Sequence, residues 1–104
     1  MSEALKPILA KLVEGKDLSS EDVQLAFEEV ITGHATPAQI GALLAALRLK
    51  GETWEEIAEA ARVMRRHALT VPHRLPQDEP LVDTCGTGGD QKGTFNVSTA
   101  TAFV

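Results

Sequence analysis

The feature of this sequence that most limits its possible folds is a proline-rich segment in the second half of the chain. Three of its five prolines fall within residues 70–80. Proline lacks a backbone N–H and its ring clashes with the preceding helical turn, so this segment is predicted to be an extended connector. A stiff connector suits two domains whose relative position matters for a cleft between them. The predicted division is a helical domain over residues 1–70, the connector over 71–80, and a second domain that starts over 81–104.

Four helices are predicted before the connector, because residues that start and end helices recur at short intervals. Ser19 is an N-cap followed by acidic residues, which the positive end of a helix dipole favours. Thr36-Pro37-Ala38-Gln39 and Thr53-Trp54-Glu55-Glu56 are capping boxes, the first with proline at the first helical position. Glycines end the first three helices. The predicted helices cover residues 3–14, 19–32, 36–51 and 53–68, joined by short turns into a bundle.

The third of these helices is unusual because residues 37–47 include no charged side chain. They are apolar or small nearly all round, whereas a helix on a protein surface shows a single apolar stripe. We therefore expect this helix to be buried on several sides. Two arrangements would satisfy that expectation: a central place in one small core, or one side packed against another subunit.

Composition and charge argue against several functional classes. The net charge of −5 disfavours nucleic-acid binding, since basic residues gather only at Arg62, Arg65, Arg66 and His67. No apolar run approaches the length of a membrane span, and Met1-Ser2-Glu3 does not open a signal peptide, so no membrane partner is expected. A single cysteine cannot form an internal disulfide, which favours a reducing, cytoplasmic setting.

Beyond the connector, a glycine-rich stretch and a polar stretch follow one another closely. Leu81-Val82 predicts a short strand, Gly86-Thr87-Gly88-Gly89 a tight turn after it, and Thr94-Phe95-Asn96-Val97-Ser98-Thr99 the start of a helix. Glycines let backbone N–H groups approach a ligand, and the N-terminus of a helix favours anions. Strand, loop and helix start are therefore predicted to form a phosphate cradle.

The best-known phosphate-binding motifs do not match this stretch. A Walker A loop would need lysine where Thr94 stands, and a dinucleotide-binding motif would need a third glycine where Gln91 stands. The simplest alternative is a loop whose glycines serve only a tight strand-to-helix connection. Asn96, Ser98 and Thr99 favour the cradle, because they offer more hydrogen-bonding capacity than a helix cap requires.

Several other residues have a structural interpretation. Cys85 is expected to be a small buried hydrophobe, since neither a histidine nor a second cysteine accompanies it. Trp54, at a helix start, is expected to pack against neighbours. Asp83 is expected to anchor the turn by accepting backbone N–H bonds. The three histidines have no ligand-like spacing, so we expect no metal site built from them.

Two motifs together resemble the signature of a known family. They are Asp-x-x-Gly-Thr-Gly-Gly-Asp over residues 83–90 and Thr-Phe-Asn-x-Ser-Thr over residues 94–99. In this order and spacing they resemble the anthranilate phosphoribosyltransferases, and residues 35–53 resemble the N-terminal helical segment of that family. The resemblance implies an α/β family fold. This chain would carry its N-terminal helical bundle, then the first strand, glycine loop and helix start of the α/β domain.

The resemblance also implies a reaction. The family transfers phosphoribosyl from phosphoribosyl pyrophosphate to the amine of anthranilate in tryptophan biosynthesis, with Mg²⁺ and without a covalent nucleophile, so no catalytic side chain is assigned here. Ser98 would place its hydroxyl on the magnesium ion, Gly86 would also border the anthranilate, and the helical domains would join two subunits in a homodimer. The positions that would bind phosphoribosyl pyrophosphate are Gly86, Gly89, Asp90, Thr94, Asn96, Val97, Ser98 and Thr99.

Members of this family are more than three times as long as this chain. Residues 100–104 resemble the first turns of an apolar helix without a cap, so we expect the chain to be the N-terminal part of a larger enzyme and inactive alone. The family's magnesium carboxylates, a basic residue for phosphate and an arginine for anthranilate would then follow Val104. Two rival predictions stay open: a pyrimidine-nucleoside phosphorylase of the same fold, and a non-catalytic helical interaction module or nucleic-acid-binding paralogue.

Overall fold

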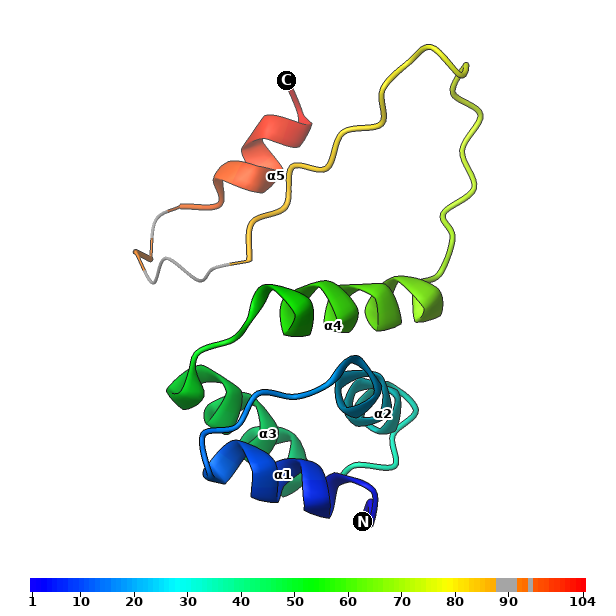
Figure 1. Ribbon diagram of the computed structural model, residues 1–104. Helices are drawn as coiled ribbons and strands as arrows, with labels where there is room; N and C mark the ends of the chain where they lie inside the picture. Colours follow the sequence, from blue (N-terminus) through cyan, green and yellow to red (C-terminus); the bar gives the residue numbers. More distant parts are fainter. Residues whose placement is uncertain (88–91, 94) are drawn as a thin grey trace. The chain divides into compact units, whose positions relative to one another are not determined.

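The computed structural model describes residues 1–87, 92–93 and 95–104. The regular secondary structure of these residues is helical. The chain divides into two compact units, Met1–Thr70 and Val71–Val104, which we describe separately. Within the described residues, the first unit contains four helices and the second contains one short helix (Figure 1). The helices are α1 (Leu5–Val13), α2 (Ser20–Ile31), α3 (Pro37–Lys50), α4 (Trp54–His67) and α5 (Val97–Ala102).

Helices α2, α3 and α4 each begin at a capping box. In each, a hydroxyl accepts the backbone N–H of the residue three positions later over 3.2 Å, and the side chain of that residue accepts the N–H of the cap. These reciprocal bonds satisfy donors that helix geometry leaves unpaired. The predicted starts of the three helices are therefore confirmed. The pairs are Ser19 with Asp22, Thr36 with Gln39, and Thr53 with Glu56.

The first two helices end at a left-handed glycine, as predicted. Gly15 and Gly33 have φ angles of 72° and 79°. In both turns the next residue donates its N–H across the turn over 3.0 Å, which satisfies one of the last helical carbonyls. At its other end, α1 begins at Leu5, two residues later than predicted. Pro7 then lies in the first turn, where its missing N–H leaves no helical bond unmade.

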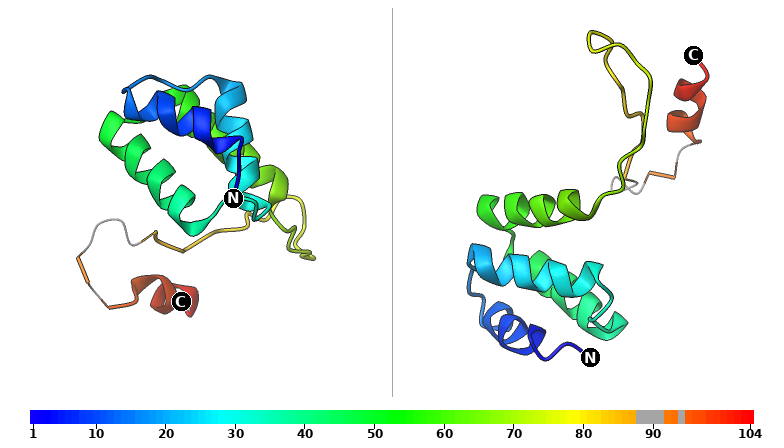
Figure 2. Two further views of the ribbon diagram at one scale, coloured as in Figure 1. Left: turned by 90° about the horizontal axis from the view of Figure 1, so that it is seen from below. Right: turned by 90° about the vertical axis from the view of Figure 1, so that its right-hand side faces the viewer.

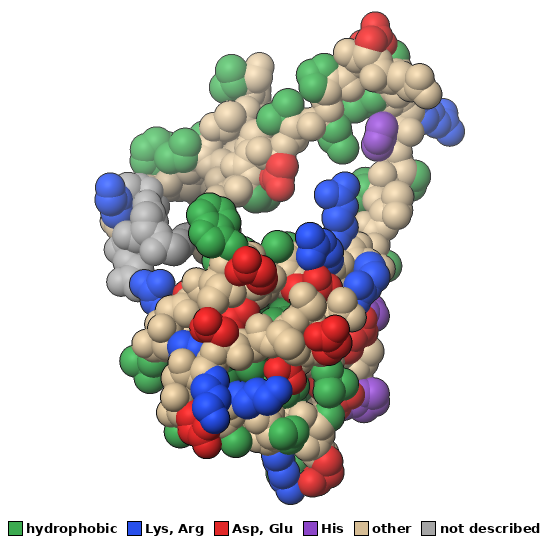
Figure 3. Space-filling model, viewed as in Figure 1, with side chains coloured by type: hydrophobic (Ala, Val, Ile, Leu, Met, Phe, Trp, Pro, Cys, Tyr) green, Lys and Arg blue, Asp and Glu red, His purple; other side chains and the backbone are tan. Residues whose placement is uncertain are grey.

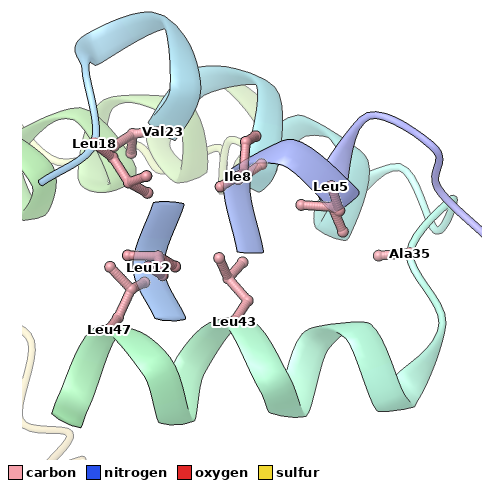
Figure 4. Packing of buried hydrophobic residues seen from close by; sticks show 9 residues of the cluster. Leu5, Ile8, Leu12, Leu18, Val23, Ala35, Leu43 and Leu47 are labelled. Carbon is pink, nitrogen blue, oxygen red and sulfur yellow. The ribbon is translucent and has the colours of Figure 1, made fainter. Parts of the chain in front are cut away.

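The core of the first unit lies between α1, α2 and α3. α1 packs along α3, and α4 packs along α2 (Figures 1 and 2). Figure 4 shows Leu43 and Leu47 of α3 pointing toward Ile8 and Leu12 of α1. Burying one such side chain stabilises the fold by about 1.5–3 kcal/mol. The buried cluster consists of Leu5, Ile8, Leu12, Leu18, Val23, Ala26, Ala35, Leu43 and Leu47.

Within this chain helix α3 is buried on one side only, so the first of the two expected arrangements, a central place in one small core, is wrong, and the second, one side packed against another subunit, stays a prediction. Gln39, Leu43 and Leu47 are buried, whereas Leu44 is 53% exposed and Leu49 is 89% exposed. The cause is the pairing of the helices, because α3 lies along α1 while α4 lies along α2. A helix with one main neighbour buries one stripe, so Ile40 and Ala46 beside that stripe are partly buried and Leu44 and Leu49 stay open.

The carboxylate of Glu56 joins the loop before α2 to the loop before α4. It accepts the N–H of Leu18 and that of Thr53, each over 2.8 Å, and the Lys50 ammonium over 2.9 Å. Burial alone would raise the pKa of Glu56, but these donors outweigh it and hold the pKa below its ordinary value. Burial alone would likewise lower the pKa of Lys50, but Asp17 and Glu56 raise it above its ordinary value. This buried ion pair is therefore well compensated.

The start of the second unit contains no helix, as its prolines predict. Its turn is closed by the N–H of Glu79, which donates to the carbonyl of Pro76 over 3.1 Å. The predicted strand at Leu81 and Val82 is wrong for this chain: in the described part of the unit, these residues lie in no strand and are 67% and 72% exposed. A strand exists only where its backbone groups pair with a neighbour, and the described residues supply none.

Charged side chains of both signs are interspersed over the face of the helical unit seen in Figure 3. Several of them join α2 to α4 or brace α4. Glu28 accepts from Arg66 over 3.1 Å and lies 2.6 Å from His67, and Arg62 pairs with Glu59 over 2.7 Å. Most of the basic cluster noted in the sequence therefore faces carboxylates. Across the part of the chain described here, no helix is both long and apolar enough to cross a membrane.

Candidate phosphate-binding site

The glycine loop and the polar motif meet at Ser98. The backbone N–H of Gly86 donates to the Ser98 hydroxyl over 3.3 Å, and the Thr84 hydroxyl donates to the Ser98 carbonyl oxygen over 3.3 Å. One short segment therefore contacts both the side chain and the backbone of Ser98. Of the described residues from 71 to 104, Thr84 and Ser98 are the two that are partly buried.

Helix α5 begins at the polar motif because Asn96 caps it. The Asn96 side-chain oxygen accepts the N–H of Thr99 over 2.9 Å, which is the usual N-cap bond. The predicted helix start near Asn96 is confirmed. Since Asn96 supplies the cap, the Ser98 hydroxyl is not needed for it and faces the loop instead.

Asp83 shapes the turn that brings Gly86 to Ser98. Its carboxylate accepts the N–H of Cys85 over 2.8 Å, so the predicted anchoring role is confirmed. A side-chain carbon at Gly86 would lie 3.9 Å from the Ser98 hydroxyl oxygen, which is an ordinary van der Waals contact. Glycine at this position therefore leaves a small open space beside the hydroxyl.

Five of the eight predicted donor-binding residues lie in the described part of the chain. The contact between Gly86 and Ser98 joins the two motifs, whereas the bond from Asn96 to Thr99 lies within the helix cap. Val97 is the first residue of α5 and is 52% exposed. The binding role of these residues stays a prediction. Gly89, Asp90 and Thr94 lie outside the described residues.

Two residues that were predicted to pack are exposed instead. Cys85 is exposed beside the loop, and Trp54 is 87% exposed at the start of α4. The residues around Cys85 form no apolar core, because every buried hydrophobic residue of the described chain lies in the first unit. Trp54 precedes the buried Glu56 by two positions, which places it on the opposite side of the helix.

The described residues offer a magnesium ion a hydroxyl ligand. Mg²⁺ prefers oxygen ligands, and the Ser98 hydroxyl has a second lone pair besides the one that faces Gly86. Where the structure describes the chain, no group of three or more His, Cys, Asp or Glu side chains could hold a metal ion.

A concavity that the sequence did not predict lies in the helical unit. It is an apolar groove of about 310 Å³ between α2, α4 and the end of α3. Large exposed apolar surfaces are uncommon on monomeric proteins and often mark interaction sites. The charge-free run in α3 was the sequence signal for part of it. Its apolar lining includes Val23, Phe27, Leu44, Leu47, Ile57 and Met64.

Both parts of the chain match domains of one enzyme family. The helical bundle domain of the glycosyl transferase family matches residues 6–68. The α/β domain of the glycosyl transferase family matches residues 78–104. No solved structure matches the chain.

Curated relatives named anthranilate phosphoribosyltransferase match almost the whole chain. The protein of Roseiflexus castenholzii is 56% identical over 96 residues, which cover 92% of this chain and 27% of the relative. The protein of Symbiobacterium thermophilum is 52% identical over 100 residues, which cover 96% of this chain and 28% of that relative. The protein of Caulobacter vibrioides is 50% identical over 104 residues, which cover 100% of this chain and 29% of that relative. The chain spans a little over a quarter of the length of these relatives. By its matched domains, the chain belongs to the glycosyl transferase family, with the helical bundle domain followed by the start of the α/β domain.

Proposed function

We propose that the protein containing this chain is an anthranilate phosphoribosyltransferase of tryptophan biosynthesis. Relatives 50–56% identical to the chain carry that name, and the matched family is one of glycosyl transferases. In the proposed reaction, the bond between the ribose anomeric carbon and a pyrophosphate oxygen breaks. The amine nitrogen of anthranilate bonds to that carbon and loses a proton, and pyrophosphate leaves.

The observation that carries this proposal is the contact of the two motifs at Ser98. The Gly86 N–H lies 3.3 Å from the Ser98 hydroxyl, so a residue without a side chain and a hydroxyl borne on a helix meet at one point. A pyrophosphate leaving group needs such fixed donors, which stabilise developing charge without reorganising. We assign donor binding to Gly86, Gly89, Asp90, Thr94, Asn96, Val97, Ser98 and Thr99.

The residues of this chain would bind and orient the leaving group. A bound magnesium ion would neutralise charge on the departing pyrophosphate, and Ser98 would give it a hydroxyl oxygen. Gly86 would also border the anthranilate, where the absence of a side chain leaves room for an aromatic ring. No nucleophile is assigned to this chain, because holding two reactants in line is by itself a large catalytic contribution.

We also propose that the helical unit joins two copies of the protein in a homodimer. The support is the apolar groove, in which Leu44, Ile57 and Met64 are 53%, 58% and 58% exposed. We further propose that residues 1–70 form the helical domain, residues 71–80 the connector and residues 81–104 the start of the α/β domain. We also propose that the protein is cytoplasmic.

Titration of the whole protein with phosphoribosyl pyrophosphate, with and without Mg²⁺, tests the proposed function. We expect magnesium-dependent binding, and loss of anthranilate when both substrates are present. Ser98→Ala should weaken the magnesium-dependent binding, while Thr101→Val, a change on the same helix, should not. Preference for inorganic phosphate, with cleavage of pyrimidine nucleosides, would assign the phosphorylase instead. Salt-sensitive DNA binding without transfer would assign the non-catalytic paralogue.

A further inference from the structure

Thr84 makes a contact to which the proposed function assigns no role. Its hydroxyl donates to the Ser98 carbonyl, 14 positions along the chain, over 3.3 Å. Gly86, two residues further on, donates its N–H to the Ser98 hydroxyl. In an extended segment, alternate residues face the same side, so Thr84 and Gly86 can both face Ser98. Cys85, which lies between them, is exposed. The segment therefore holds Ser98 at two points.

We propose that Thr84 is a positioning residue for Ser98 and so sets the strength of magnesium-dependent donor binding. This inference rests on the proposed function, in which Ser98 is the magnesium ligand. A bond to the hydroxyl alone leaves α5, on which Ser98 lies, free to turn about that bond. The second bond, to the carbonyl, fixes the backbone from which the hydroxyl projects. Partners that orient a metal ligand in this way commonly change metal affinity by about 10- to 100-fold.

Two features separate this role from a contribution to stability. Thr84 and Ser98 are partly buried while the other described residues of 71–104 are exposed, so burial among the described residues of this unit is confined to this contact. At 3.3 Å, the hydroxyl-to-carbonyl bond is longer than the usual O–H···O distance and adds little to folding by itself. Hydrogen bonds of a functional site are often long before the ligand arrives and tighten once it binds.

The test compares whole-protein variants by calorimetry, with phosphoribosyl pyrophosphate, varied Mg²⁺ and no anthranilate. Thr84→Val removes the hydroxyl but keeps the shape, and Thr84→Ser keeps the hydroxyl. Thr101→Val is the matched control, since the Thr101 hydroxyl donates to the Val97 carbonyl over 2.8 Å within α5. We expect Thr84→Val to raise the half-saturating Mg²⁺ concentration about three- to tenfold, the effect of one hydrogen bond. Thr84→Ser should restore it, and the control should not change it.

The outcomes separate this inference from the proposed function. If Ser98→Ala weakens magnesium-dependent binding while Thr84→Val leaves it unchanged, the positioning role is overturned and the proposed function stands. If Ser98→Ala has no effect either, the magnesium role of Ser98 fails and the positioning role fails with it. A melting temperature that falls equally in Thr84→Val and Thr84→Ser, with no difference in Mg²⁺ requirement between them, would show a structural role and overturn the inference.

Discussion

At the scale of single residues, Gln39 shows how one side chain can fix a chain segment. Its oxygen accepts the N–H of Ser2 over 3.0 Å and that of Thr36 over 3.1 Å, and its nitrogen donates to the Ser2 carbonyl over 2.8 Å. Ser2 is 3% exposed. An amide carries an acceptor and donors side by side, so it pairs with a peptide group as a neighbouring strand would. No local signal in the sequence indicates this contact.

Gln39→Leu should therefore destabilise the helical unit. The substitution leaves buried backbone groups of Ser2 without partners, at a cost of about 1–3 kcal/mol. Urea unfolding followed by far-UV circular dichroism measures the loss, with Gln77→Leu in the exposed connector as the control. An unfolding midpoint of Gln39→Leu equal to that of the control would contradict the assigned role.

Gly86→Ala should separate binding from folding. The added carbon would lie at an ordinary contact distance of 3.9 Å from the Ser98 hydroxyl oxygen, so the fold should tolerate it. Affinity for phosphoribosyl pyrophosphate in the whole protein should fall on the order of tenfold, because the methyl group takes space beside the donors. Gly41→Ala in α3, with nothing within 4 Å, is the control. Unchanged affinity in Gly86→Ala would place the phosphates elsewhere.

Stability should depend on pH through Glu56 and Lys50. The lowered pKa of Glu56 means that its stabilisation is complete above the ordinary carboxyl pKa of about 4.3 and is lost as pH falls through the lowered pKa. The raised pKa of Lys50 means that its stabilisation is complete below about pH 10.4 and is lost as pH rises through the raised pKa. Stability from the pair should therefore be greatest between these limits.

Glu56→Gln should be about 1–3 kcal/mol less stable than the unsubstituted protein at neutral pH, because it removes one of the two carboxylates that pair with the Lys50 ammonium and leaves only Asp17. The difference should narrow in acid, where the native carboxylate also becomes protonated. Thermal unfolding at a series of pH values between about 2 and 8, spaced about one pH unit apart, measures both effects. Glu55→Gln, at an exposed position beside it, should match the unsubstituted protein throughout. A constant difference across this range would contradict the assignment to Glu56.

At the scale of helices, α3 presents two kinds of surface. Leu43 is fully buried against α1, whereas Leu49 is 89% exposed. Leu43→Ala should cost about 2–5 kcal/mol of unfolding free energy, since it removes buried methyl groups and leaves a cavity. Leu49→Ala should change it by less than about 0.5 kcal/mol. Chemical denaturation of the two variants checks the orientation of the helix, and equal losses would contradict it.

The open side of α3 carries the proposed dimer contact. Leu44→Asp puts a charge in the groove, and at 53% exposure the side chain is open enough for the folded monomer to accept it. Dissociation to folded monomers is therefore expected, and Ala45→Glu, which lies next to Leu44 but outside the groove lining, tests how far the contact extends. Sedimentation with circular dichroism measures both, with Leu49→Asp, outside the groove lining, as the control. Folded dimers at low concentration in both variants would exclude this surface.

The ends of the helices could be predicted from the sequence, but their pairing could not. Caps and glycine turns depend on chemistry within a few residues, which is why the positions around Ser19, Thr36 and Gly33 were predicted correctly. The exposure of Trp54 and the single buried stripe of α3 depend on which helices lie together. That is a property of the whole core, and local patterns do not contain it.

In the candidate site, too, local features could be predicted from the sequence and contacts between distant residues could not. The turn at Asp83 and the helix cap at Asn96 could be predicted from residue types, because side-chain bonds to nearby backbone groups are local properties. The strand at Leu81 was predicted from its apolar side chains, but a strand also needs a partner. The bond from Thr84 joins positions 14 apart and depends on how the loop faces α5, so residue types alone do not predict it.

At the scale of the whole molecule, residues 1–104 by themselves should keep the helical unit but show no transferase activity. Every buried hydrophobic residue of the described chain lies before residue 71, so the described residues of the second unit form no apolar core that could support the loop. We also expect no tight donor binding. Calorimetric titration of this segment with phosphoribosyl pyrophosphate and Mg²⁺ is the direct test. Micromolar binding would show that the loop is already organised without further partners.

The order in which the helices pair has a consequence for synthesis on the ribosome. α1 lies along α3, and α2 lies along α4, so each main pair is separated by an intervening helix. As the nascent chain emerges, α1 must wait for residues up to Lys50, and α2 must wait for residues up to His67. Contacts between distant segments form more slowly than those between neighbours. The core between α1, α2 and α3 should therefore be able to form once Lys50 has emerged, whereas the side of α2 that faces α4 stays uncovered until α4 has left the exit tunnel.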